Sequence, residues 1–542
     1  PILGGAYRNR SLIAAAQRSV NLYLEKNPPG SQSPVPFTLY PRSGLRLLKK
    51  APSFGVGRGL YQDTAGQLYA VIGTIVYSVD ANFDMTAIGD IAPGNSIVSM
   101  ADNGTTILMV DGTPSGYQID VQSKAFLVIS DPAFYGGDHV DYLRTVFVIN
   151  RPGTRQFYIS GSNAATWDPL DFGAKTSSAD PLYTCAALND QLWLLGTRKG
   201  EVWYFSGDAL FPFQQMPGVI IEHGCGGSPT TSVELQLPTG VAGISAEDAN
   251  GFTASVDGQV VTELGVRIKA AKYSVAQTDK FLLWLTQDKD GKPWIARGGT
   301  DYSVTRVSTS AIEAEIQNYK KWDDCIAYAY QQFGHVFVDF VFPSADKTWS
   351  LDLSTEEWAE YVSIDVNGNE HRMRGFLSAY CYNTNIMLDW KTGDLYALDP
   401  NYYTDGIDPI KCVRGFPHVG AGGSRVSYGG FIADMDVGQV KGVMSDMSVV
   451  SSPWSAGFSN GFGPFYEQNV PQVRCRFSST RGYTFGNRRS RSLGTTGQYN
   501  VVAKWPNWGE ARDGIFEIEW AIPCATALNG GFLSPDPQVS ES

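Results

Sequence analysis

Residues 68–79 read LYAVIGTIVYSV, in which two apolar runs flank a short turn. Residues 192–205 repeat the pattern as LWLLGTRKGEVWYF, with a charged turn. Further copies start near Thr106, Thr145, Phe252, Phe281, His335 and Leu388. Their spacing, mostly about 35 to 60 residues, is typical of blades or solenoid turns. A single hairpin cannot bury its own apolar face, so several must stack around a common axis. The pattern predicts a β-propeller of about six to eight blades.

The composition agrees with a mostly-β chain. Aromatic residues make up 12% of the 542 residues, and 58 glycines suit many short strands joined by tight turns. We expect three parts: an N-terminal basic segment over residues 1–60, the propeller over residues 61–405, and a C-terminal β module over residues 406–542. The first and third parts are expected to form one β-rich module together.

A few elements outside the repeat can be predicted from periodicity. Ile312, Ile316 and Tyr319 fall on one helical face, which predicts a helix over residues 310–319. Residues 11–18 could add one or two helical turns capped by Ser11. Strands are expected over residues 20–24, and again over residues 473–477, 499–504 and 515–520.

Charge is distributed unevenly along the chain. Residues 1–60 carry nine lysines or arginines against one acid, Glu25, for a net charge of +8. Residues 468–509 carry seven basic residues and no acid, for +7. Because the whole chain has a net charge of −12, the remaining residues hold −27. The two ends are expected to share one module that faces something anionic, or acidic parts of neighbouring subunits; ordinary surface arginines are the alternative.

Glycine and aromatic residues are concentrated late in the chain. Residues 415–430 contain six glycines, and residues 451–465 mix glycine with four aromatic side chains. Polar linkers rarely carry so many aromatics, so this stretch is a candidate for contact loops that become ordered on assembly, with simple flexible loops as the alternative. The candidate contact residues are Trp454, Phe458, Phe462 and Phe465.

Catalytic and metal-binding signatures are missing from the sequence. The five histidines are isolated, and the seven cysteines are scattered without a Cys-x-x-Cys pair. His223 next to Cys225 could form a thiol–imidazole pair, but the neighbouring glycines favour a turn. We therefore expect no catalytic residues, no metal and no cofactor. No stretch reaches the roughly 18 to 20 apolar residues of a membrane span.

A glycan-binding protein or a glycan-hydrolysing, sialidase-like propeller is the alternative function. Such hydrolases need two positioned carboxylates near the axis, which a sequence cannot exclude. Residues 478–485 read SSTRGYTF and resemble the Ser-x-Asp-x-Gly-x-Thr-Trp box of sialidases, with Thr480 in place of the Asp and Phe485 in place of the Trp. The box forms a structural turn in that family and would not show catalysis.

Other marks spread along the chain resemble the tail-hub or nozzle proteins of short-tailed bacteriophages, a family also called packaged-DNA stabilisation proteins. The marks occur in the expected order over nearly the full chain. They are Arg10-Ser11, residues 17–25, residues 41–45, residues 192–196, residues 201–203, residues 211–213, Gly224-Cys225, Gly334-His335, Thr348-Trp349, Asp352, Trp358, residues 471–473, residues 492–494, residues 497–499, Trp508-Gly509 and residues 511–513.

The resemblance implies a structural, non-enzymatic virion protein. It implies a homohexameric ring below the portal and adaptor rings, whose lumen continues the DNA channel, retains packaged DNA and conducts it during ejection. Tail fibres or spikes would dock on the outside, and double-stranded DNA would pass without sequence-specific binding. The protein would be assembled in the host cytoplasm and located in the virion tail.

The basic residues are then expected at the ring or adaptor interface. The candidates are Arg8, Arg10, Arg18, Arg474, Arg476, Arg481, Arg488, Arg489 and Arg491. Exchange of Arg488 and Arg489 for Glu is expected to block ring assembly and leave the monomer folded. Part of the −27 is expected to face the ring axis, because a negative lumen repels phosphates.

Overall fold

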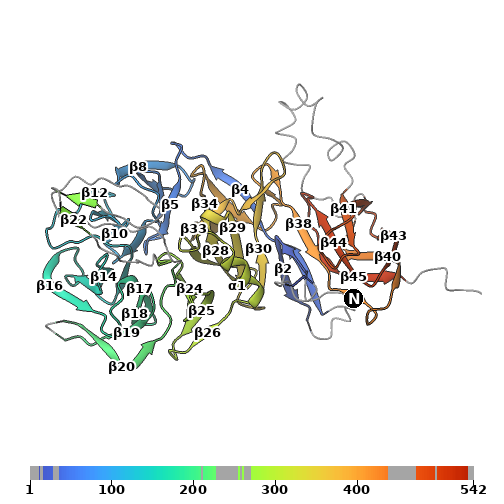
Figure 1. Cartoon of the computed structure of the whole chain (residues 1–542). Helices are drawn as coiled ribbons and strands as arrows, with labels where there is room; N and C mark the ends of the chain where they lie inside the picture. Colours follow the sequence, from blue (N-terminus) through green and yellow to red (C-terminus); the bar gives the residue numbers. More distant parts are fainter. Residues whose placement is uncertain are drawn as a thin grey trace, which may run out of the picture.

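The structure is a computed structural model that describes residues 11–12, 16–28, 36–208, 211–227, 254–256, 259–261, 270–437, 471–494 and 497–534. Within these residues, seven blades of four strands each form a β-propeller (Figure 1). Five blades are separate four-stranded sheets, and the other two are parts of larger sheets. Neighbouring strands in each blade are antiparallel, and the first strands of successive blades lie around the axis. The propeller fold and its mostly-β class are therefore confirmed, with a blade number inside the expected range.

Six blades use strands that follow one another in sequence. Blade 1 consists of β5 (Gly57–Gln62), β6 (Leu68–Ile72), β7 (Ile75–Val79) and β8 (Met85–Asp90); blade 2 of β9 (Ser99–Asp102), β10 (Thr106–Val110), β11 (Gly116–Asp120) and β12 (Phe126–Val128); blade 3 of β13 (Val140–Leu143), β14 (Val146–Asn150), β15 (Gln156–Ser160) and β16 (Trp167–Ala174). Blade 4 consists of β17 (Leu182–Leu188), β18 (Gln191–Gly196), β19 (Gly200–Phe205) and β20 (Phe213–Ile221); blade 5 of β23 (Ala276–Gln277), β24 (Phe281–Gln287), β25 (Pro293–Gly299) and β26 (Val304–Arg306); blade 6 of β27 (Ile326–Gln332), β28 (His335–Phe342), β29 (Lys347–Asp352) and β30 (Glu357–Glu360).

Blade 7 closes the ring of blades with a strand from the other end of the chain. It combines β33 (Gly375–Cys381), β34 (Thr384–Asp389) and β35 (Leu395–Asp399) with the N-terminal β4 (Gly44–Lys49) as the outer strand. The expected boundary at residue 60 therefore does not separate the parts of the chain cleanly. Residues 44–49 belong to the propeller because β35 would otherwise lack an outer partner.

The recurring hairpins are the two middle strands of each blade. In β6, Leu68, Ala70 and Ile72 pack toward blade 7, whereas Tyr69 and Val71 pack toward blade 2. Both faces of a middle strand are thus buried, which explains why its sequence is continuously apolar. Seven of the eight predicted hairpins correspond to blades, and the copy near Phe252 corresponds to the separate pair β21 (Ala254–Val256) and β22 (Gln259–Val261).

Seven hydrophobic cores, one between each pair of adjacent blades, hold the propeller together. Each contains buried side chains from both neighbours, and the last joins blade 7 to blade 1. Helix α1 (Ser310–Gln317) lies between blades 5 and 6 and adds Ile312 and Ile316 to their core, which confirms the predicted helix. The described residues of the segment 11–18 contain no helix.

A β-sandwich lies beside the propeller (Figure 1). One sheet contains β1 (Ser19–Val20), β38 (Cys412–Gly415), β44 (Asp513–Trp520), β41 (Gln472–Ser478) and β42 (Arg489–Ser492), with β39 (Val419–Gly420) also paired to β44; the other contains β2 (Leu22–Lys26), β3 (Phe37–Pro41), β45 (Leu528–Ser534), β40 (Val426–Met435) and β43 (Ala503–Ala511). The two sheets therefore combine strands from both ends of the chain. Two short strand pairs and one 3₁₀ helix are also present: β31 (Val362–Ile364) with β32 (Glu370–Arg372), β36 (Thr404–Asp405) with β37 (Asp408–Pro409), and η1 (Pro343–Ala345).

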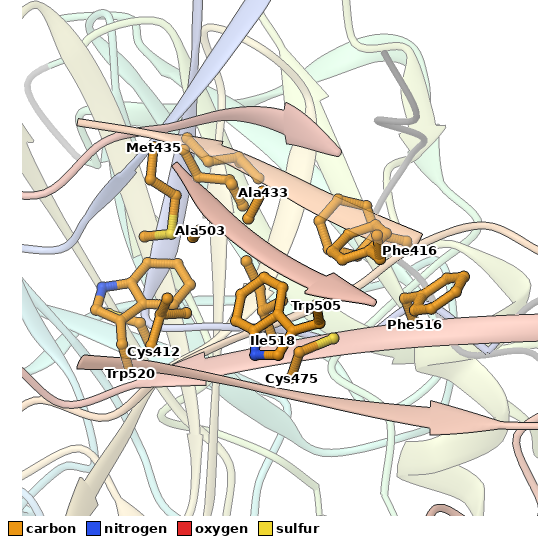
Figure 2. Packing of buried hydrophobic residues seen from close by; sticks show 14 of the residues in the cluster. Cys412, Phe416, Ala433, Met435, Cys475, Ala503, Trp505, Phe516, Ile518 and Trp520 are labelled. Carbon is orange, nitrogen blue, oxygen red and sulfur yellow. The ribbon is translucent and has the colours of Figure 1, made fainter. Parts of the chain in front are cut away.

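The sandwich has an aromatic core of its own. Figure 2 shows Phe416 and Phe516 on one side of this core and Trp520 with Met435 on the other, with Trp505 between them. The rings of Phe431 and Phe516 stack with centroids 4.5 Å apart. The predicted strands at residues 473–477 and 515–520 are confirmed. The strand predicted over residues 499–504 begins only at Ala503, as β43.

Candidate functional site

The junction between propeller and sandwich is built from the N-terminal family marks. Strand β1 pairs in parallel with β30 of blade 6 and antiparallel with β38 of the sandwich, so one sheet runs through both parts. Asn21 follows β1 with a φ of 56°. Its side chain donates to the carbonyls of Val362 and Lys411 at 2.9 and 2.8 Å and accepts from Arg42 at 2.9 Å. The polar residue Asn21 of this segment thus has a structural role.

Arg42 is the centre of that junction. Its guanidinium makes two hydrogen bonds to the Asp405 carboxylate, at 2.9 and 2.5 Å, and both side chains are only 2% exposed. A third hydrogen bond reaches the carbonyl of Val362. Two residues later, a Cβ at Gly44 would lie 2.2 Å from the carbonyl oxygen of Tyr402, so only glycine fits there. This is a physical reason for the run Pro41 to Leu45.

The predicted interface arginines are largely paired within the chain. Arg18 binds Glu360 at 2.9 Å and Glu370 at 2.5 Å, at the junction. On the sandwich, Arg474 and Arg488 approach Glu519 at 3.8 and 2.5 Å, Arg476 binds Glu517, and Arg481 lies 3.5 Å from Asp513. Sequence reasoning did not anticipate these partners, because β44 carries the acids and is distant in sequence from the arginines.

Arg489 and Arg491 differ from the other arginines. Arg489 lies 4.1 Å above the ring of Trp508 and donates to the carbonyls of Pro506 and Asn507. Arg491 donates to the carbonyl of Lys504 at 2.8 Å. All four residues of their strand, β42, are exposed. Among the described residues neither arginine has a carboxylate partner, so their charges stay uncompensated.

Some predicted contact residues cannot be placed. Arg8, Arg10, Trp454, Phe458, Phe462 and Phe465 lie outside the described residues. Their proposed role in assembly stays a prediction. A glutamate at position 488 would lie beside Glu519, so the exchange of Arg488 and Arg489 for Glu would disturb the monomer as well as an interface.

The propeller axis contains a cavity of about 390 Å³, lined by inner strands of blades 1 to 5. Two acids reach it. Asp102 accepts hydrogen bonds from the Tyr61 hydroxyl and from Thr64, and Asp141 accepts from the amides of Ala187 and Tyr142. Burial raises the pKa of Asp141 to about 6. Both carboxylates therefore hold neighbouring strands and blades together.

The remaining candidates for chemistry are structural too. Burial raises the pKa of the Cys225 thiol to about 12, which is opposite to the activation of a nucleophile, and His223 packs edge-on against Trp294. In residues 478–485, Thr480 accepts from the amide of Thr484 at 2.9 Å and closes a turn of the sandwich. The part of the chain that the structure describes contains no group of three metal-ligating side chains.

No helix of the described residues is long and apolar enough to cross a membrane.

Comparison with known proteins points to one family. Residues 1–256 match the family model described as "Phage_stabilise: Bacteriophage P22 Gp10, beta-propeller". This match confirms the resemblance to the packaged-DNA stabilisation proteins over residues 1–256. A search of curated proteins found no match.

Solved structures add only general likeness. A chain of the "Crystal Structure of Mitotic Checkpoint Complex" is 13% identical, with 65% of this chain and 93% of that chain covered and a TM-score of 0.37. The extracellular domain of a one-component system from B. thetaiotaomicron is 7% identical, with 66% and 40% covered and a TM-score of 0.38. Neither similarity carries a functional argument.

Proposed function

We propose that this protein, whose residues 1–256 match the phage packaged-DNA stabilisation family, forms a homohexameric tail-hub or nozzle ring below the portal and adaptor rings. The ring continues the DNA channel, retains packaged DNA and conducts it during ejection. Its outer surface receives tail fibres or spikes. The family match is the observation that carries this proposal.

The small volume of the cavity at the propeller axis supports a DNA channel that is enclosed by several copies of the chain. A cavity of about 390 Å³ has the size of a small-molecule pocket. Duplex DNA, whose major groove alone is about 12 Å wide, cannot pass through such a space. Any DNA channel must therefore be enclosed between copies of the chain, with the blades as parts of its wall.

The sheet shared by blade 6 and the sandwich supports a rigid subunit in the wall of the ring. Strand β1 joins blade 6 to the sandwich through backbone hydrogen bonds, and the buried pair of Arg42 and Asp405 fixes the same junction. A closed ring needs head-to-tail interfaces that repeat at a constant angle. A subunit whose two parts are connected in this way can hold that angle.

Electrostatics supports passage of DNA without tight binding. The residues outside the two basic segments hold a net charge of −27. Affinity for phosphates depends on lysine and arginine, so an acidic wall repels the duplex. We expect part of this negative charge to face the lumen.

A sizing experiment with the adaptor ring tests the proposal. Light scattering coupled to size exclusion should show a complex of six copies with the adaptor ring, and electron cryomicroscopy of that complex should show a central channel with acidic walls. A chain that stays monomeric in the mixture, or a channel lined mainly by Lys and Arg, would contradict the proposal. Binding to glycan arrays without ring formation would instead favour the sugar-binding alternative.

A further inference from the structure

The outer strands of blades 2 to 4 expose an unusual amount of apolar surface. Leu127 and Val128 in β12 are each 57% exposed, Leu170 in β16 is 80% exposed, and Phe172 and Ile220 on β16 and β20 are 44% and 48% exposed. Each of these strands is the last strand of its sheet. These five residues lie on the outer strands of three successive blades and are together called the apolar edge below.

The other blades do not share this feature. The outer strand of blade 6 is covered by β1, and that of blade 7 pairs with β36. Outer strands β8 and β26 expose no large apolar residue, and β4 exposes only Leu47, at 38%. Large exposed apolar patches on a soluble protein mark contact sites. The apolar edge is thus confined to three successive blades that lie on the side away from the sandwich (Figure 1).

The apolar edge also carries uncompensated negative charge. Asp168 and Asp171 flank Leu170 in β16, and neither has an ion pair among the described residues. Burial and the neighbouring Asp168 raise the pKa of the Asp171 carboxyl. Two carboxylates that repel each other gain stability when a cation from a partner approaches them.

The opposite end of the molecule carries the complementary features. Arg489 and Arg491 are exposed on β42 and lack a carboxylate partner among the described residues. The segments next to β42 and β43 expose Tyr483, Tyr499 and Val502, by 64%, 66% and 60%. Arginine and tyrosine are enriched where protein interfaces gain most of their affinity. We call Arg489, Arg491, Tyr483, Tyr499 and Val502 the basic end.

We infer that the apolar edge of one copy receives the basic end of a second copy of this chain. The inference rests on the proposed ring. The two surfaces complement each other in charge and in apolar character, and they lie at opposite ends of the molecule (Figure 1). A contact between opposite ends is head-to-tail, which is the type of interface that closes into a ring.

Side chains, rather than an added strand, make this contact. Strand β16 contains Pro169 and strand β20 contains Pro217, and the pairing of both strands with their neighbours shifts in register. Proline and bulges on an edge strand oppose pairing with a further strand. The affinity must therefore come from the apolar side chains and from the pairs between Asp168 or Asp171 and Arg489 or Arg491.

Charge reversal on each surface tests the inference. One variant carries Asp168→Lys with Asp171→Lys, and the other carries Arg489→Glu with Arg491→Glu. Each alone should raise the dissociation constant of self-association by about a hundredfold. An equimolar mixture of the two variants should assemble again, because each altered surface then meets an altered partner of opposite charge. Sedimentation velocity measures all of these states on the full chain.

Matched controls separate this interface from general charge effects. Asp90→Lys with Asp290→Lys, and Lys280→Glu with Lys289→Glu, change the net charge by the same amounts at exposed positions of blades 1 and 5. They should assemble like the wild type, and circular dichroism should show that every variant is folded. If Arg489→Glu with Arg491→Glu unfolds the sandwich, self-association of the Asp168→Lys, Asp171→Lys variant alone decides the test.

Three outcomes would overturn the inference and are distinguishable. A wild type that assembles while both charge-reversed variants also assemble normally would assign the apolar edge to another partner, and the ring proposal would survive. A wild type that stays monomeric at its highest soluble concentration and with the adaptor ring would remove both proposals. Loss of assembly in each variant without recovery in the mixture would also contradict direct pairing of the two surfaces.

Discussion

The junction between propeller and sandwich depends on one residue pair. Arg42 and Asp405 are each 2% exposed and are joined by two hydrogen bonds, and each makes further hydrogen bonds to neighbouring groups. A buried pair of this kind adds little compared with apolar residues of the same size, but removing one partner leaves a buried charge alone. The pair is therefore more important for fixing the junction than for total stability.

Replacement of Arg42 should show how much stability is lost when the buried Asp405 charge has no ion-pair partner. Arg42→Met keeps most of the side-chain volume and leaves the Asp405 carboxylate unpaired, so the free energy of unfolding should fall by about 3 to 5 kcal/mol. Arg46→Met is the matched control, since Arg46 is 45% exposed in its pair with Asp399 and should cost at most about 1 kcal/mol. Urea titration measures both, and equal effects would contradict the central role of Arg42.

Asp339 should give the stability a pH dependence. It lies between Tyr328 and Ser350 on neighbouring strands, it is fully buried, and burial raises its pKa from 3.8 to about 7. The folded carboxyl thus holds its proton at pH values where the unfolded one has lost it. Stability is lowered progressively as pH rises from about 4 to about 7, and the loss is complete above that range.

Asp339→Asn should remove that contribution. Between pH 5 and pH 7 the wild type should lose about 1.4 kcal/mol per pH unit relative to this variant. Urea titrations at several pH values provide the comparison, and Asp90→Asn, an exposed acid, serves as the control. Parallel curves for wild type and Asp339→Asn would show that the carboxyl is already ionised in the folded protein.

At the scale of elements, strand β4 closes the propeller by pairing with β35 as the outer strand of blade 7. Leu45 is fully buried in the core between blades 6 and 7, whereas Leu47 on the same strand is 38% exposed. Leu45→Ala should lower the free energy of unfolding by about 2 to 5 kcal/mol. Leu47→Ala should change it by no more than about 0.5 kcal/mol. Thermal unfolding that responds equally to both would argue against closure through Leu45.

The sequence predicted some elements well for a physical reason. Middle strands such as β6 and β18 are buried on both faces, so their apolar runs are easy to recognise. Outer strands such as β16 are mostly exposed and carry proline, so they lack a recognisable apolar pattern. The place of β4 depends on pairing with β35, and no local pattern encodes a partner so distant in sequence.

The candidate site was predicted less completely than the fold. The run of arginines in residues 474–491 was evident from the sequence, but the acids of β44 that neutralise most of them were not assigned to them. Only the structure separates Arg489 and Arg491, which bind backbone carbonyls, from Arg476, which binds Glu517. The exposed apolar side chains of blades 2 to 4 had no recognisable signal, because exposure depends on which strand is outermost.

At the scale of the whole molecule, the sheet that runs through blade 6 and the sandwich should make the two parts unfold together. Differential scanning calorimetry should give a single transition for the wild type. Arg42→Met should split or broaden it, because the junction is then weakened. Two well-separated transitions in the wild type would show that β1 does not couple the parts.

Closure by β4 also has a consequence for synthesis of the chain. Its partner β35 is made about 350 residues later, which at roughly 5 to 20 residues per second takes about 20 to 70 s. During that interval the nascent chain holds blades that cannot yet complete the circle, and an N-terminal strand without its neighbour. The propeller can therefore close only after the chain up to Asp399 has left the ribosome, and until then β4 must be kept from pairing elsewhere.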